Sequence, residues 1–310
     1  MQQDSITIPD SMTTIRDYIR WGASRFTAAG LFFGHGTATA IDDAAAIVLF
    51  VLHLPYDLPA EYFAATLTVA ERTAVIRLFE RRISEKIPSA YLTHETVFAG
   101  LSFYVDERVL VPRSPIAELI KTQFSPWLPA AQVRQVLDLC TGSGCIAIAC
   151  AYAFPDARLT AVDLSADALE VARINVAQHH LAGQVELLQS DLFGELQGKQ
   201  YDLIISNPPY VCQAEWETLP AEFRAEPELG FKGGESGLDL VIKILAEAIN
   251  FLQPSGVMVV EVGSSAETLL HKFPGVPFLW LEFDHGGDGV FLLTAEQLLE
   301  FNKLFKAALN

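Results

Sequence analysis

Four residues that could orient a planar nitrogen group, Asn207, Pro208, Pro209 and Tyr210, directly follow the apolar stretch 201–206. An amide or aryl amine is a poor nucleophile because its lone pair is delocalised, so a catalyst for such a group must chiefly orient it. The Asn207 side-chain oxygen and the Pro208 carbonyl can each accept one N–H of the target. Proline fixes φ and holds the acceptors in place, while Tyr210 can pack on the planar group. The motif alone leaves adenine, guanine and glutamine open as owners of that group.

A second group of candidates follows the strand-like stretch 135–140. Gly142 and Gly144 let the backbone turn tightly and approach a ligand, and a helix is expected to begin behind them. Asp163 ends the next strand-like stretch, about 20 residues on, where its carboxylate can accept hydrogen bonds from ribose hydroxyls. The third glycine of a dinucleotide fingerprint is absent, and Asp138 would repel a pyrophosphate but pair with an ammonium. The pattern therefore favours S-adenosylmethionine.

Each of these candidate binding residues also has a purely structural interpretation. The glycines could form an ordinary turn, and Asp163 could cap the following helix. Adenine is expected to lie near Asp191 and Leu192, although a turn carboxylate and a core leucine would look the same. Asn207 with its two prolines could simply end a strand.

Composition restricts the class of protein. The chain has 310 residues, of which 51% are hydrophobic and 19% charged, so we expect one or two globular domains and no disorder. The formal net charge is −17 and no basic stripe is present, which disfavours a nucleic-acid substrate. An acidic enzyme would attract a basic protein partner, although the charge could also serve solubility alone.

Targeting and metal signals are lacking. The apolar run 44–52 is too short to cross a membrane, and residues 1–10 lack the basic start and apolar segment of a secretory signal, so we expect a cytoplasmic protein without a membrane partner. Cys140, Cys145 and Cys150, with Cys212 further on, form no C-x-x-C pair. Free thiols and no metal are therefore predicted.

The elements that must position these residues follow two sequence patterns, one helical and one that alternates strands with helices. Helical periodicity from 13 to 86 predicts three to five amphipathic helices, and residues flanking Asp106 and Glu107 predict a β-hairpin. From Ser114 on, strands alternate with helices, as in a parallel sheet with helices on both faces. The expected strands are 135–140, 158–164, 184–192, 201–206, 256–263, 278–284 and 289–294.

The last two expected strands should pair antiparallel through a glycine-bearing turn. The pattern thus predicts the seven-stranded, Rossmann-like sheet of class I methyltransferases with an antiparallel last strand. The expected domains are a small helical domain at 1–96, a β-hairpin linker at 97–113 and a methyltransferase domain at 114–310.

Four stretches, "DLCTGSGCIAIA", "VDLSADAL", "SDLF" and "SNPPYV", together with "EPELGFKGGESGLDL" at 226–240, resemble the HemK-type protein glutamine methyltransferases over nearly the whole chain. Residues 80–120 and 276–294 are similar to the PrmB branch, which modifies ribosomal protein L three. The branch acting on peptide-chain release factors is its near relative. Many members of the wider family have glycine where this chain has Cys140. In this departure the chain resembles the PrmB branch.

The resemblance implies methyl transfer from S-adenosylmethionine, leaving S-adenosylhomocysteine, to a glutamine side-chain nitrogen of ribosomal protein L three, free or in an assembly intermediate. The helical domain would recognise this protein. Implied cofactor contacts are Asp138, Cys140, Thr141, Gly142, Ser143, Gly144, Asp163, Asp191, Leu192 and Asn207, and Asn207, Pro208, Pro209 and Tyr210 would hold the glutamine.

Release-factor glutamine methylation is the main alternative, and nucleic-acid amine methylation is less favoured. A non-catalytic nucleotide-binding or assembly factor with this fold remains a third. His35 is expected to be a loop residue, because a sulfonium donor needs no strong general base. Glu226 and Pro227 could shape a substrate loop.

Overall fold

The computed structural model describes residues 11–284 and 286–309. The chain divides into two compact units, one of Met1–Glu95 with Pro220–Ala225 and one of Thr96–Leu219 with Glu226–Asn310. Residues 1–10, on which the cytoplasmic expectation partly rests, lie outside the described part. Within that part, no helix combines the length and the apolar character needed to cross a membrane.

The first unit is helical. Thr14 and Thr68 each begin a helix with a capping box, in which the side chain accepts a hydrogen bond from the backbone three residues on. The described helices are α1 (Ile15–Ala28), α2 (Ala40–Val51), the 3₁₀ helix η1 (Ala60–Ala64), α3 (Val69–Glu85), α4 (Ser89–Thr93) and the 3₁₀ helix η3 (Ala221–Ala225).

A buried ion pair fixes the loop between α1 and α2. Arg82 Nε donates to Asp43 Oδ2 at 2.8 Å, and Arg82 Nη2 donates to the Phe32 carbonyl at 3.0 Å. Glu222 in turn accepts from Phe32 N at 3.0 Å, and the ring of His35 packs against Phe223 with centroids 4.4 Å apart. These contacts explain why Pro220–Ala225 belongs to this unit. His35 lies in the loop, as expected, but is buried.

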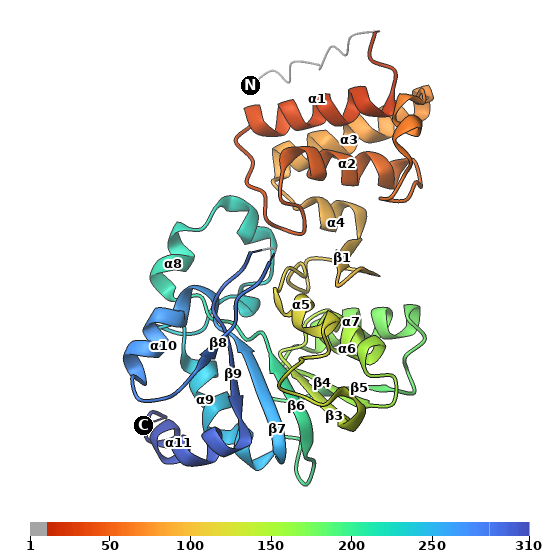
Figure 1. Cartoon of the computed structure of the whole chain (residues 1–310). Helices are drawn as coiled ribbons and strands as arrows, with labels where there is room; N and C mark the ends of the chain where they lie inside the picture. The colour runs from red at the N-terminus through yellow and green to blue at the C-terminus, as the bar shows by residue number, and fades with distance from the viewer. Residues whose placement is uncertain (1–10, 285, 310) are drawn as a thin grey trace. The chain divides into compact units, whose positions relative to one another are not determined.

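The second unit is built on a seven-stranded sheet in the order β5-β4-β3-β6-β7-β9-β8 (Figure 1). β9 runs antiparallel to β7 and β8, whereas the pairs among β3 to β7 are parallel. The strands are β3 (Gln135–Leu139), β4 (Arg158–Asp163), β5 (Val185–Gln189), β6 (Tyr201–Ser206), β7 (Leu252–Glu261), β8 (Leu279–Trp280) and β9 (Val290–Thr294). The predicted class I methyltransferase fold is confirmed.

Alternate residues of each central strand enter separate cores. In β6, Leu203 and Ile205 belong to one cluster and Ile204 to the other. α5, α6 and α7 cover one face of the sheet, and α9, α10 and α11 cover the opposite face (Figure 1).

The remaining bounds complete the second unit. Its α-helices are α5 (Ile116–Lys121), α6 (Cys145–Ala153), α7 (Ala166–Gln178), α8 (Gln213–Thr218), α9 (Asp239–Glu247), α10 (Ala266–Lys272) and α11 (Ala295–Ala307). Its 3₁₀ helices are η2 (Ala130–Gln132), η4 (Glu228–Gly230), η5 (Ala248–Asn250) and η6 (Gly263–Ser265).

The hairpin differs from its prediction. β1 (Thr96–Phe98) and β2 (Leu101–Phe103) turn at Ala99 and Gly100, whose φ angles are 52° and 85°. Two residues with positive φ are what a tight hairpin turn requires. Asp106 instead accepts hydrogen bonds from the backbone and guanidinium of Arg108, so the expected turn there is a local loop.

Candidate active site

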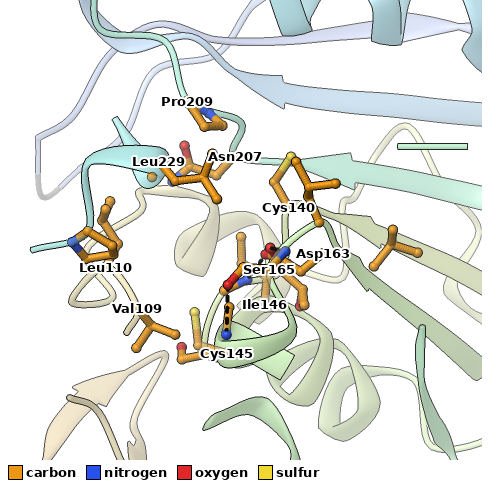
Figure 2. Close-up of a pocket in the computed structure, with 18 of the residues that line it drawn as sticks. Val109, Leu110, Cys140, Cys145, Ile146, Asp163, Ser165, Asn207, Pro209 and Leu229 are labelled. Atoms are coloured by element: carbon orange, nitrogen blue, oxygen red, sulfur yellow. Dashed lines mark hydrogen bonds between the residues drawn. The ribbon is translucent and has the colours of Figure 1, made fainter. Parts of the chain in front are cut away.

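A cavity lies at the carboxyl ends of the parallel strands, all within the second unit (Figure 2). Nine of the residues expected from the sequence line it: Cys140, Thr141, Gly142, Ser143, Asp163, Asp191, Leu192, Asn207 and Pro209. Asp138, Gly144, Pro208 and Tyr210 do not line it. The strand ends therefore bring most of the expected set together, as they do in open α/β sheets generally.

Hydrogen bonds between neighbouring strand ends fix the cavity wall. Thr141 N donates to the Val162 carbonyl at 2.9 Å, tying the turn after β3 to β4. Ser206 Oγ donates to the Leu139 carbonyl at 2.9 Å, tying the end of β6 to β3. Asn207 is therefore held beside the turn that begins at Cys140.

The turn between β3 and α6 uses three residues with positive φ: Cys140 at 60°, Gly142 at 55° and Gly144 at 79°. A Cβ at Gly144 would come within 3.3 Å of the Ala172 Cβ, so this glycine permits close packing on α7. A Cβ at Gly142 would meet nothing within 4 Å, so this glycine borders open space. Burial raises the pKa of the Cys140 thiol, which therefore stays protonated and is a poor nucleophile.

Asp163 joins the two sides of the turn. Its Oδ2 accepts from Gly142 N and its Oδ1 from Ser165 N, both at 2.9 Å. Ser165, not Asp163, caps α7, because its side chain accepts from Ala168 N. Burial raises the pKa of Asp163, while the hydrogen bonds from Ser165 and Gly142 oppose that rise.

Asp138 shapes the turn from behind instead of lining the cavity. It is 1% exposed, and its Oδ2 accepts from Thr141 Oγ1 and from Ala147 N. Among the residues that the structure describes, none hydrogen-bonds its Oδ1. Burial raises the pKa of Asp138 to about 7. Because Asp138 does not line the cavity, its expected pairing with a ligand ammonium stays a prediction.

The end of β5 supplies a compact turn. Ser190 Oγ donates to the Leu192 carbonyl at 3.1 Å and accepts from Glu195 N at 3.0 Å. Leu192 has a φ of 48° and is 7% exposed, whereas Asp191 is exposed. Leu192 thus contributes an apolar wall to the cavity while also packing in the core.

Only part of the motif after β6 lines the cavity. Asn207 and Pro209 line the cavity, and the Asn207 side-chain amide makes no hydrogen bond to any residue in the described part of the chain. Tyr210 lies elsewhere: its hydroxyl donates to Glu261 Oε1 at 3.0 Å, and its carbonyl accepts from Ser265 Oγ at 2.7 Å. The phenol is therefore engaged by the protein itself.

Two further segments line the cavity: 108–114, which was missed from the sequence, and Pro227 with Leu229 and Gly230, of which only Pro227 was suggested as part of a substrate loop. Glu226, which is 4% exposed, joins them: Oε2 accepts from Val111 N at 2.9 Å and from Arg113 Nη1 at 3.0 Å. More than 100 residues separate these partners in the chain, so no local pattern could reveal the pairing. Only the suggestion that Glu226 and Pro227 shape a substrate loop pointed toward it.

Asn175 supports the cofactor turn and was also missed. Fully buried in α7, it donates to the Ser143 carbonyl at 2.9 Å and to the Tyr104 carbonyl at 3.0 Å. Its Oδ1 accepts from Tyr104 N at 2.7 Å. An asparagine within an amphipathic helix pattern gives no signal of this role.

The cavity wall fits S-adenosylmethionine. Gly142 leaves open space against the backbone, Asp163 retains lone pairs for ribose hydroxyls, and Ile146 adds apolar surface. In the described residues, no three His, Cys, Asp or Glu side chains gather as metal ligands would. The four cysteines are free thiols.

Comparisons with known proteins agree with this geometry. Residues 122–223 match the family model described as methyltransferase small domain. Catalytic-domain structures of hMettl16 with MAT2A 3′UTR hairpins 6 and 1 both have a TM-score of 0.52 and 15% identity, covering 77% and 90% of this chain and 87% and 91% of theirs. At that identity they support the fold alone.

Two curated relatives are much more similar. A Xanthomonas campestris pv. campestris protein named ribosomal protein uL3 glutamine methyltransferase is 51% identical over 290 residues, 94% of each chain. A Francisella tularensis subsp. tularensis protein of the same name is 44% identical over 306 residues, 98% of each chain. The resemblance drawn from the motifs is confirmed: the chain belongs to the family of the ribosomal protein uL3 glutamine methyltransferases, which use S-adenosylmethionine.

Proposed function

We propose that this protein transfers a methyl group from S-adenosylmethionine to the side-chain amide nitrogen of a glutamine in ribosomal protein uL3. The observation that carries the proposal is the Asn207 amide, which borders the same cavity as the Cys140 turn and has no hydrogen-bond partner among the described residues. An acceptor left without an internal partner is available to a substrate N–H. The names of the two curated relatives support uL3 as the target.

The residues of this chain divide the work. When bound, S-adenosylmethionine supplies an electrophilic methyl group. Asp163 would accept the ribose hydroxyls, the turn from Cys140 to Gly144 would cradle the cofactor, and Leu192 with Asp191 would border its adenine. Asp138 would hold the turn in shape from behind, through Thr141.

On the substrate side, the Asn207 side-chain oxygen and the Pro208 carbonyl would accept the two N–H groups of the glutamine amide. That arrangement turns the nitrogen toward the methyl group and stabilises positive charge as it develops on nitrogen. Pro209 lines the same cavity as Asn207 and would border the glutamine amide, and Tyr210 anchors the loop through its hydroxyl.

The helical unit would recognise the protein substrate. The reaction would take place in the cytoplasm. The formal net charge of −17 favours encounter with a basic protein. The substrate is free uL3 or a ribosome-assembly intermediate that contains it.

The test is labelled methyl transfer from S-adenosylmethionine to purified uL3, to a peptide-chain release factor and to ribosomal RNA, side by side. Methylation of a uL3 glutamine, located by mass spectrometry, is the expected result. Transfer only to the release factor or only to RNA would refute the substrate assignment.

The orienting role is tested by Asn207→Ala, which should lower kcat by about 10² or more, as for loss of one acceptor or donor at a reacting centre. Cofactor affinity should change little, because the truncation removes no internal hydrogen bond. Asn250→Ala, at an exposed asparagine of η5, is the matched control and should retain full activity. Normal turnover by Asn207→Ala would rule out the orienting mechanism.

A further inference from the structure

Glu261 is a buried carboxylate at the end of β7 that the proposed chemistry does not use. It is 5% exposed, yet both of its oxygens are engaged by hydroxyl groups. Tyr210 Oη donates to Oε1 at 3.0 Å, and Ser114 Oγ donates to Oε2. A carboxylate that accepts two hydroxyl hydrogen bonds is strongly ordered by them, and it orders both donors in return.

Tyr210 is held at three points. Besides the bond to Glu261, its carbonyl accepts from Ser265 Oγ at 2.7 Å. Its ring lies so close to Gly263 that a Cβ there would come within 2.5 Å of Tyr210 Cε2. Tyr210 ends the motif that begins at Asn207, so whatever fixes the tyrosine also limits the positions open to the acceptor loop.

Ser114 is a residue of the cavity wall. It lines the cavity at the end of the segment 108–114, and its Oγ accepts from Ile116 N at 3.2 Å where α5 begins. One carboxylate therefore joins a residue of the acceptor loop to a residue of the cavity wall, across 147 positions of sequence between Ser114 and Glu261.

We infer that Glu261 is a positioning residue, which holds the Asn207–Tyr210 loop in register with the cofactor cavity by binding Tyr210 and Ser114 together. The inference rests on the proposed function, because it assigns Glu261 a role in orienting the substrate amide. Glu261 does not line the cavity, so it would act through these two hydroxyl groups.

Two opposing influences act on the Glu261 carboxyl group. Burial raises its pKa, whereas the hydrogen bonds from Ser114 and Tyr210 and the positive charge of Arg113 oppose the rise, and Asp288 adds to it. A protonated Glu261 would have to donate one hydrogen bond itself and could not accept from both hydroxyls in the same way.

Glu261→Gln is the direct test, because glutamine keeps the shape but has one acceptor oxygen and an NH₂ group. One of the two hydroxyls must then turn around or lose its partner. We expect kcat with uL3 to fall by about 10-fold or more, while the dissociation constant for S-adenosylmethionine, measured by calorimetry, stays within about 3-fold. Glu267→Gln, at an exposed position on α10, is the matched control and should behave as wild type.

Tyr210→Phe removes one arm of the link without changing any charge, and it serves if Glu261→Gln folds poorly. It should also lower kcat more than cofactor affinity, and the double variant should be less impaired than the product of the two single effects, because both cut the same link. Unchanged kcat in Glu261→Gln, an equal loss of cofactor affinity, or additive effects in the double variant would each overturn the inference.

The outcome for the wild-type enzyme separates the two proposals. If wild type does not methylate uL3, the proposed function fails. If wild type methylates uL3 and Glu261→Gln does so at the same rate, only the positioning role of Glu261 fails.

Discussion

Replacing Asp163 by asparagine should weaken cofactor binding more than it weakens the fold. Asp163 accepts Gly142 N with one oxygen and Ser165 N with the other, both at 2.9 Å. Asparagine has a single acceptor oxygen, so its NH₂ group must face one of these two N–H donors. Either the turn at Gly142 or the start of α7 then loses its partner.

The magnitude follows from those contacts. A buried donor left without a partner costs about 1–3 kcal/mol, and each 1.4 kcal/mol corresponds to a factor of about 10 in binding. If the Gly142 N–H is the donor that loses its acceptor, cofactor affinity should fall by about 5-fold to 150-fold, since the turn must be held to bind. The loss in unfolding free energy of Asp163→Asn should be smaller than its loss in cofactor-binding free energy. Burial raises the pKa of Asp163, so asparagine removes the cost of burying its charge.

Calorimetry with S-adenosylmethionine measures the affinity, and urea unfolding of the cofactor-free protein measures the stability. Asp167→Asn is the matched control, because Asp167 is exposed in the first turn of the adjacent helix α7. Its affinity should match wild type. If Asp163→Asn binds the cofactor as tightly as Asp167→Asn does, the role assigned to Asp163 is refuted.

Two further predictions concern the same turn. Burial raises the pKa of Asp138 to about 7, so the folded state favours the protonated acid. Protonated Asp138 therefore stabilises the fold fully below about pH 4, the pKa of an unfolded aspartate. This contribution is lost as the pH rises to about 7, by at most about 1.4 kcal/mol per pH unit. Urea unfolding from pH 4 to 8 should show wild type losing stability relative to Asp138→Asn, and a pH-independent difference would contradict this. Cys140→Gly should relieve a φ of 60° that costs a side-chain-bearing residue about 1–2 kcal/mol, offset by about 0.5–1 kcal/mol of glycine chain entropy. Unfolding free energy should thus rise by up to about 1.5 kcal/mol, and a clear fall would show that thiol packing matters more.

The central strands could be predicted because they are buried on both faces and read as apolar runs. The predicted span 201–206 coincides with β6. The predicted strand 278–284 was too long, since β8 is only Leu279–Trp280 at the edge of the sheet. Only Leu279 and Trp280 pair in register with β9, whereas Leu281 and Phe283 give the span its apolar character by packing in a core cluster beyond the strand.

The hairpin turn was predicted at the wrong place because residue types misled the prediction. Asp106 and Glu107 are residues typical of turns, whereas Ala99, which occupies the turn at a φ of 52°, is not. The Pro220–Ala225 segment gave no signal that it belongs with the helical unit, because its attachment depends on tertiary contacts of Glu222 and Phe223 with the loop after α1.

The candidate site was predictable to the extent that it follows strand ends. The positions of Gly142, Asp163 and Asn207 could be predicted from the strand ends, because parallel strands place their carboxyl ends at one edge of the sheet, and the family resemblance added Cys140. The walls formed by 108–114 and 227–230 could not, because they are joined through Glu226 across the length of the chain.

The direction of Tyr210 is the sharpest example of what spacing cannot supply. Its place in the motif predicts packing on the substrate, which stays a prediction, and the structure adds that its hydroxyl donates to Glu261. That bond has a physical rationale: orienting a weak nucleophile requires that its acceptors be fixed before the substrate arrives. Proline fixes φ at two positions but not the placement of the loop as a whole. A tyrosine anchored by a buried carboxylate supplies that missing constraint, so the motif carries both the acceptors and their anchor.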